Sequence, residues 1–171
     1  MKKILILFSL ALTIVACQQS YTPFKNARWI GISLGNQPHY GEDGHANLPA
    51  TYLKRDFTIA GKIHQADLYI VGLGYSNCYI NGKNVTTDIM PSNYDRTIYY
   101  NTYDVTDLVQ QGDNQIDVTL GSGYFVGMIQ KWNMPYFGEP RLLAKLCIRT
   151  SNGTVVILTD GEWQVSNQGP I

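Results

Sequence analysis

The chain has 171 residues and a formal net charge of zero, with only 15% charged residues but 12 tyrosines and 16 glycines. This length allows one domain with its own core, and the balanced charge excludes the basic footprint that nucleic-acid binding needs. The low charge and the many tyrosines and glycines favour an all-β secreted module over a helical bundle.

The N-terminus has the pattern of an export signal. Two lysines precede an apolar run over residues 4–15, which is too short to span a bilayer as a helix. Residues 14–17, Ile-Val-Ala-Cys, resemble the lipobox of bacterial lipoproteins. We predict a signal peptide over 1–16, lipidation of Cys17 and a lipidated tether over 17–24. The expected location is that of an exported lipoprotein at the outer membrane or cell surface, or on the periplasmic side.

Most of the remaining chain alternates apolar and polar residues in short runs, which is the pattern of half-buried strands. Glycine, proline and asparagine clusters separate these runs, as expected for turns. The predicted strands are Lys25–Leu34 with Trp29 and Ile30 as anchors, Tyr52–Ile59, Gln65–Val71, Tyr75–Ile80, Thr97–Val105, residues 115–120, Leu142–Thr150, Thr154–Thr159 and Glu162–Ser166.

Short dipeptides predict how these strands connect. Asn81-Gly82, Asn152-Gly153 and Asp160-Gly161 favour hairpins because such pairs tolerate positive φ. We place Gly72-Leu73-Gly74 inside another hairpin, which excludes it as a phosphate-binding loop. The resulting fold is an all-β antiparallel β-sandwich over 25–171, of the jelly-roll or galactose-binding-like kind.

A single helical turn is expected over residues 107–111, between two strands. Asp104 and Thr106 have the side chains that cap such a turn, and Gly112 has the conformational freedom to end it. The aspartates of this region therefore have structural roles.

Two cysteines remain beyond the predicted lipidation site. Cys78 shares strand parity with the apolar Ile80, whereas Cys147 shares parity with Lys145 and Arg149. A disulfide needs both thiols on facing positions. We therefore expect both to be packed or half-buried free thiols.

Catalytic patterns are weak in this sequence. Sugar hydrolysis needs two carboxylates flanking a cleft, and Glu139 is the carboxylate that lacks an evident structural role. No Gly-x-Ser-x-Gly segment is present, and the three histidines lie in loop or strand-start positions in the N-terminal half. We expect a chain that is not catalytic by itself and needs no cofactor.

One loop could bind a metal. It contains His39, Glu42, Asp43 and His45 within seven residues, and these side chains are common metal ligands. A solvated polar loop is the favoured alternative, so we predict no metal site.

Loop aromatics carry the remaining functional signal. Flat rings on loops at a sandwich edge suit stacking on sugars, contact with another domain, or packing on the local core. The candidate contact residues for a sugar or a domain are Tyr124, Phe125, Trp132, Tyr136, Phe137 and Glu139.

Several motifs, in their order along the chain, resemble the N-terminal β-sandwich module of bacterial α-L-rhamnosidases. They cover nearly the whole chain after the signal. One departure is Gly123-Tyr-Phe125, where that family usually has Gly-Trp-Tyr. The motifs are Leu68-Tyr-Ile-Val-Gly-Leu-Gly-Tyr75, Tyr79-Ile-Asn-Gly-Lys-Asn-Val85, Tyr103-Asp-Val-Thr-Asp-Leu108, Gly112-Asp-Asn114, Leu120-Gly-Ser-Gly-Tyr124, Arg141-Leu-Leu-Ala-Lys-Leu146, Asp160-Gly-Glu-Trp163 and Gly169-Pro-Ile171.

The resemblance implies an accessory role in a glycoside hydrolase. In that family the module precedes a large α-helical barrel that carries the catalytic carboxylates, so no catalytic residue is carried over. The sequence therefore predicts a non-catalytic, carbohydrate-associated module from a truncated or split gene. The expected partners are a rhamnose-containing glycan or a catalytic barrel domain, and the membrane through the lipid anchor only. The alternative is a stand-alone carbohydrate-binding lipoprotein at the surface.

Overall fold

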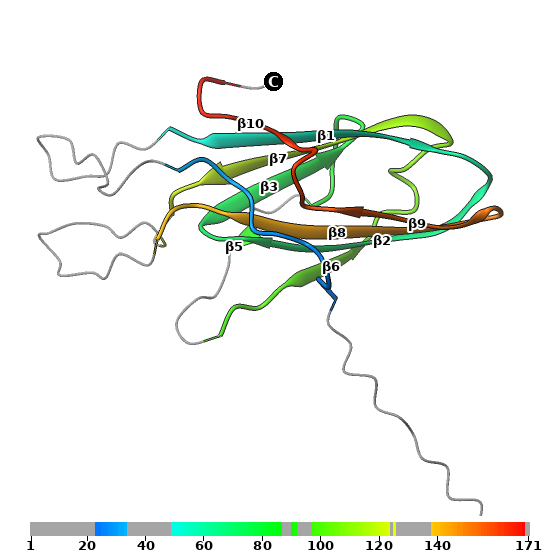
Figure 1. Ribbon diagram of the computed structural model, residues 1–171, viewed down its shortest axis with the longest axis horizontal. Helices are drawn as coiled ribbons and strands as arrows, with labels where there is room; N and C mark the ends of the chain where they lie inside the picture. Colours follow the sequence, from blue (N-terminus) through cyan, green and yellow to red (C-terminus); the bar gives the residue numbers. More distant parts are fainter. Residues whose placement is uncertain are drawn as a thin grey trace, which may run out of the picture.

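The computed structural model describes residues 23–33, 49–86, 90–91, 97–123, 125 and 138–169. All regular elements in these ranges are strands, arranged in two antiparallel sheets that pack as a β-sandwich (Figure 1). The predicted all-β sandwich is therefore confirmed. No helix in the described part of the chain has the length and apolarity to cross a membrane. The predicted signal peptide over 1–16 and Cys17 lie outside the described residues.

The larger sheet forms one layer of Figure 1. Its main path runs in the order β10, β1, β7, β3, β4, and β5 also pairs with β3. The sheet is centred on β7, which pairs along its length with β1 on one side and β3 on the other. The strand bounds are β1 Thr51–Ile59, β3 Tyr75–Ile80, β4 Lys83–Asn84, β5 Met90–Pro91, β7 Gly112–Gly121 and β10 Gln164–Ser166.

The smaller sheet forms the other layer, in the order β6, β2, β8, β9. The long pairing of β2 with β8 holds it together, with one irregularity between Ile63 and Gln65. Its strand bounds are β2 Ile63–Gly72, β6 Asn101–Asp104, β8 Leu142–Thr150 and β9 Gly153–Leu158.

The core lies between the two sheets. Burial alternates along the long strands as the sequence predicts, because successive side chains of a strand point to opposite faces. Each fully buried leucine or isoleucine contributes about 2 kcal/mol to the free energy of unfolding. The fully buried apolar side chains include Leu53, Leu68, Ile70, Ile80, Ile116, Val118, Leu120, Leu142, Leu146 and Ile148.

Two predicted hairpins are wrong, and both connections instead change sheets. Gly72-Leu73-Gly74 carries the chain from β2 in the smaller sheet to β3 in the larger one. Gly74 has φ of +109° there, and a Cβ on it would lie 2.2 Å from the carbonyl oxygen of Gly121. Asp160-Gly161 likewise links β9 to β10, which pairs with β1 and not with β9. A sandwich needs such corners to bring both sheets around one core.

The N-terminal strand prediction is also wrong. Residues 25–33 contain a single bridge, between Ile30 and Leu142, in place of a strand. Ile30 packs on the core as predicted, but Trp29 is 42% exposed and does not belong to the core cluster. The predicted strand Thr97–Val105 shortens to β6, because only its last part pairs with β2.

Candidate functional site

The outer face of the larger sheet is polar. Leu53, Cys78 and Val118 point inward from three neighbouring strands, so their sequence neighbours point outward. The register places these outward residues in rows across the strands. We call this surface the polar face, and it consists of Tyr52, Lys54, Asp56, Thr58, Asn77, Tyr79, Asp113, Gln115, Asp117 and Thr119.

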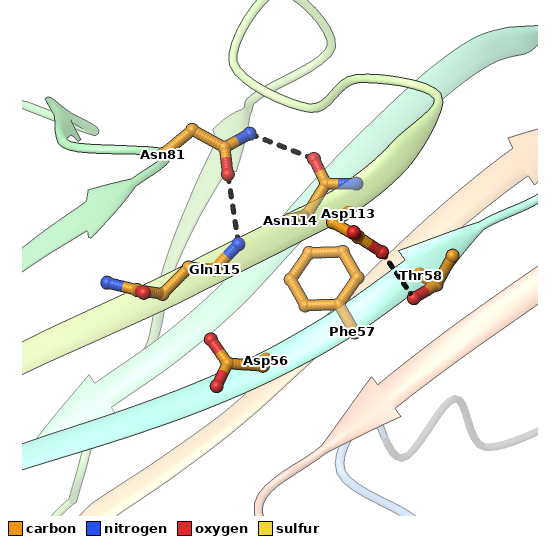
Figure 2. A pocket seen from close by; sticks show the side chains of 7 residues that line it. All are labelled: Asp56, Phe57, Thr58, Asn81, Asp113, Asn114 and Gln115. Carbon is orange, nitrogen blue, oxygen red and sulfur yellow. Dashed lines mark hydrogen bonds between the residues drawn. The ribbon is translucent and has the colours of Figure 1, made fainter.

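One end of the polar face holds an open hollow of about 470 Å³, which we call the end pocket. Figure 2 shows the amide of Asn81 directed at Asn114 and at the backbone of Gln115. The end pocket is lined by Asp56, Phe57, Thr58, Asn81, Asp113, Asn114 and Gln115.

Asn114 is the centre of the hydrogen bonding at this end. Its Oδ1 accepts from Asn81 Nδ2 and from the Gln110 backbone N–H, both at 2.8 Å. Its Nδ2 donates to the carbonyl oxygens of Gln110 at 2.7 Å and Gly112 at 2.9 Å. The side chain is only 4% exposed, and these four bonds use its full hydrogen-bonding capacity. Asn114 therefore holds the turn before β7 and has no capacity left for a ligand.

Asn81 completes this network from the hairpin after β3. Its φ of 51° lies in the left-handed region, which confirms the predicted Asn-Gly turn. Its Oδ1 accepts from the Gln115 backbone N–H, and its Nδ2 donates to the Leu108 carbonyl oxygen, both at 2.9 Å. Asn81 thus ties the hairpin to β7 and to the turn before it.

Two carboxylates line the end pocket, and each has a local partner. Asp113 accepts a hydrogen bond from the Thr58 hydroxyl at 2.9 Å. Asp56 lies 3.8 Å from the Lys54 amine, with a side chain that is 61% exposed. Both carboxylates are therefore engaged in contacts with neighbouring side chains of the polar face.

A second hollow adjoins the end pocket and shares Gln115 with it. We call it the tyrosine groove. Its volume is about 330 Å³, and half-buried tyrosines from β1 and β3 contribute to its lining. The lining residues are Tyr52, Leu53, Lys54, Tyr79, Gly82, Gln115, Asp117, Val118 and Thr119.

Hydrogen bonds between outward side chains order the tyrosine groove. Asn77 Nδ2 donates to the Tyr79 hydroxyl at 2.9 Å, which fixes one edge of the ring. Gln115 Nε2 donates to Asp117 Oδ2 at 2.6 Å on the central strand. The groove thus combines aromatic rings with ordered polar groups.

A third hollow, of about 590 Å³, lies beside the turn after β6 and includes Asp104. Thr106 donates to the Asp104 carboxylate through its hydroxyl at 2.6 Å and its backbone N–H at 3.0 Å. These bonds, the hydroxyl bond first, hold the pKa of Asp104 below its usual value. The predicted capping by Asp104 is confirmed, although the turn spans residues 106–108 and lies earlier than predicted.

Comparison with known proteins decides the family. The model of the α-L-rhamnosidase N-terminal domain family matches residues 61–171. The chain belongs to this family. An α-L-rhamnosidase from Formosa agariphila is 32% identical over 152 residues, which cover 85% of this chain and 16% of that relative. The chain therefore corresponds to only a small part of a full-length relative.

Solved structures agree with this assignment. The α-L-rhamnosidase from Dictyoglumus thermophilum superposes with a TM-score of 0.68 and 27% identity, over 84% of this chain and 17% of that one. The Streptomyces avermitilis α-L-rhamnosidase, solved in complex with L-rhamnose, superposes with a TM-score of 0.60 and 26% identity. It covers 70% of this chain and 12% of its own. The resemblance noted in the sequence is thus confirmed as family membership.

In this rhamnosidase-type domain, the predicted contact residues fall into two groups. Phe125 is 6% exposed and packs in a small cluster with Val71, Leu73, Phe24 and Leu143. This is the core-packing alternative that the sequence left open. Tyr124, Trp132, Tyr136 and Phe137 lie outside the described residues, so their proposed contacts stay predictions.

Glu139 is engaged with neighbouring side chains. Its carboxylate forms a close ion pair with Arg141 and accepts a 3.4 Å hydrogen bond from the Ser33 hydroxyl. Its side chain is only 14% exposed. Its contact with a sugar or a second domain stays a prediction.

The metal prediction concerns residues outside the described ranges. His39, Glu42, Asp43 and His45 all lie there. Within the described ranges, no three histidine, cysteine, aspartate or glutamate side chains are grouped to hold a metal ion.

The cysteines follow the predicted parity. Cys78 is fully buried and Cys147 is half-buried, and both are free thiols. Burial, and secondarily the charge of Asp117, raises the pKa of the Cys78 thiol far above its ordinary value. Cys78 is therefore an inert core residue beneath the polar face.

The tyrosine groove is the feature that sequence reasoning missed. Tyr52 and Tyr79 each alternate with buried residues along their strands. This alternation was the signal in the sequence that both side chains point outward. The two tyrosines line one groove because β7 pairs with both of their strands. Nothing in the local patterns shows that pairing.

Proposed function

We propose that this chain is a non-catalytic, carbohydrate-associated accessory module of an α-L-rhamnosidase-type glycoside hydrolase. The family match over residues 61–171 carries this proposal, because the matching model is that of the N-terminal domain. The local partners of Asp113, Glu139 and Asp104 support it, since these carboxylates are already used in structural contacts.

The partner in this proposal is a rhamnose-containing glycan or a catalytic α-helical barrel domain. The Streptomyces avermitilis relative was crystallised with L-rhamnose, which makes this sugar the first probe to use. The jelly-roll or galactose-binding-like class is proposed as the finer fold assignment. The two sheet-changing connections support it.

Two assays on the purified chain test the function. Titration with L-rhamnose and with rhamnose-containing oligosaccharides should give saturable binding for at least one of them. An aryl α-L-rhamnoside should not be cleaved above the buffer rate. Release of the aryl group by the pure chain would contradict the non-catalytic assignment. Flat titrations throughout would contradict carbohydrate association.

The alternative function is a stand-alone carbohydrate-binding lipoprotein at the surface. The lipobox-like segment ending in Cys17 favours it, and also supports export with anchoring of the module by lipid. Labelled palmitate should be incorporated by the wild-type chain in a bacterial host and not by Cys17→Ala. Equal labelling of the wild-type chain and the variant would contradict lipid anchoring under both proposed functions.

A further inference from the structure

We infer that the tyrosine groove is a glycan-binding site that takes a sugar ring between Tyr52 and Tyr79, with further sugar units extending over Gln115 into the end pocket. This inference rests on the proposed carbohydrate association. It places the contact on the outer face of the larger sheet, away from the loop aromatics predicted from the sequence.

The strand register supplies the geometry. Lys54, Asp117 and Tyr79 form one row across β1, β7 and β3, and Tyr52 lies beside Thr119 in the next row. The two tyrosines thus come from strands on opposite sides of β7, diagonal to one another. Polar side chains of β7 lie between them. The groove therefore has a tyrosine at each edge and polar side chains of β7 at its base.

The chemistry fits a pyranose ring. The faces of a sugar carry C–H groups that pack on aromatic rings, and its hydroxyl groups both donate and accept hydrogen bonds. Lys54 offers a donor, Asp117 an acceptor and Thr119 a hydroxyl that serves as either. This mixture suits a neutral ligand with many hydroxyls better than an anion, because Asp117 and Asp56 oppose a negative charge.

The dimensions fit a short chain of sugars. The groove volume of about 330 Å³ is at the lower end of the range typical for small-molecule sites. The polar face then continues from Tyr52 to Thr58 along β1, which is roughly 20 Å at about 3.3 Å per residue. Because Gln115 lines both hollows, one oligosaccharide can span them without a break. An oligosaccharide should therefore bind more tightly than a single sugar.

The groove is ordered before any ligand arrives. The Asn77–Tyr79 and Gln115–Asp117 hydrogen bonds hold a ring and a polar group in place. Preorganised side chains lose less conformational entropy on binding. Cross-strand packing alone is the structural alternative for tyrosines on a sheet, and it predicts an effect on stability without an effect on binding.

Isothermal titration of the purified chain tests this inference. The probes are L-rhamnose and a rhamnose-containing tetrasaccharide, and the variants are Tyr52→Ala and Tyr79→Ala. We expect each variant to weaken binding at least tenfold, and the tetrasaccharide to bind more tightly than L-rhamnose. Tyr99→Ala is the matched control, because Tyr99 is 63% exposed and lies outside the groove. It should leave binding unchanged.

Circular dichroism melting separates folding from binding. If a tyrosine variant fails to fold, Lys54→Met and Asp117→Asn take its place, because they remove polar contacts on outward positions. Unchanged affinity in folded groove variants would overturn the inference while leaving the proposed function intact. Absence of binding by the wild-type chain would overturn both.

Discussion

The two adjoining hollows on the polar face use similar residues for different purposes. In the end pocket, Asn81 and Asn114 turn their amides toward each other and toward backbone groups of the turn before β7. In the tyrosine groove, Tyr52 and Tyr79 line a space that is open to solvent, and the bonds found there link outward side chains. The asparagines of the first hollow serve a structural network, whereas the tyrosines of the second are available to a ligand.

This difference shows how a polar cluster should be judged. The end pocket is the larger of the two and contains two carboxylates. Its Asn114, however, has no free donor or acceptor, because four hydrogen bonds occupy its amide. The hydrogen bonds of the buried Asn114 amide are stabilising, because an unpaired buried polar group costs about 1–3 kcal/mol. Substitutions in the two hollows should therefore affect different properties.

The largest effect is expected from Asn114→Ala. The substitution leaves the Gln110 N–H and the carbonyl oxygens of Gln110 and Gly112 without their partner. We expect a loss of about 3 kcal/mol in the free energy of unfolding, measured by urea denaturation. Asn77→Ala is the matched control, because it removes an outward amide beside the tyrosine groove and should cost less than about 1 kcal/mol. Equal losses in both variants would contradict the structural role of Asn114.

A smaller effect is expected from Asn81→Ala. This substitution removes three hydrogen bonds and places alanine at φ of 51°, where a non-glycine residue is strained. We expect a loss of about 2 kcal/mol. Asn81→Gly removes the same bonds without the strain, so it should be the less destabilising of the two by urea denaturation. The reverse order would show that the hairpin does not need the left-handed conformation.

The smallest effect is expected from Asp104→Asn, at the exposed turn beside the third hollow. Its lowered pKa means that the ionised carboxylate is favoured in the folded chain, through its bonds from Thr106. The resulting stability is present above the unfolded pKa of about 3.9 and is lost as the pH falls through the lowered folded pKa. Wild type should melt slightly above the variant at pH 7. The gap should close in strong acid, and a gap that widens there would contradict this account.

Much of the fold follows from local patterns. The alternation of Ile116, Val118 and Leu120 predicts the inward face of β7. Asn81-Gly82 predicts the turn between β3 and β4, which has the expected positive φ. Local patterns do not show which sheet receives a strand. The sequence predicts a hairpin at Gly72-Leu73-Gly74. Only the pairing of β3 with β7 shows that this segment connects the two sheets.

The candidate site was harder to predict for the same reason. The capping by Asp104 depends on neighbours in sequence and was predicted. The tyrosine groove depends on the pairing of β7 with β1 and β3, whose tyrosines are 27 positions apart in the chain. The sequence instead pointed to loop aromatics. One of them, Phe125, packs in an apolar cluster with Leu73.

The most direct test of the central claim is a nuclear magnetic resonance titration of the isotope-labelled chain with a rhamnose-containing oligosaccharide. We expect saturable shifts of backbone amides that cluster at Tyr52–Lys54, Tyr79 and Gln115–Thr119, with smaller shifts toward Thr58. Amides of the smaller sheet should not move. Shifts confined to residues 126–137 would contradict the groove as the site. No shift at saturating oligosaccharide would contradict carbohydrate association of this module.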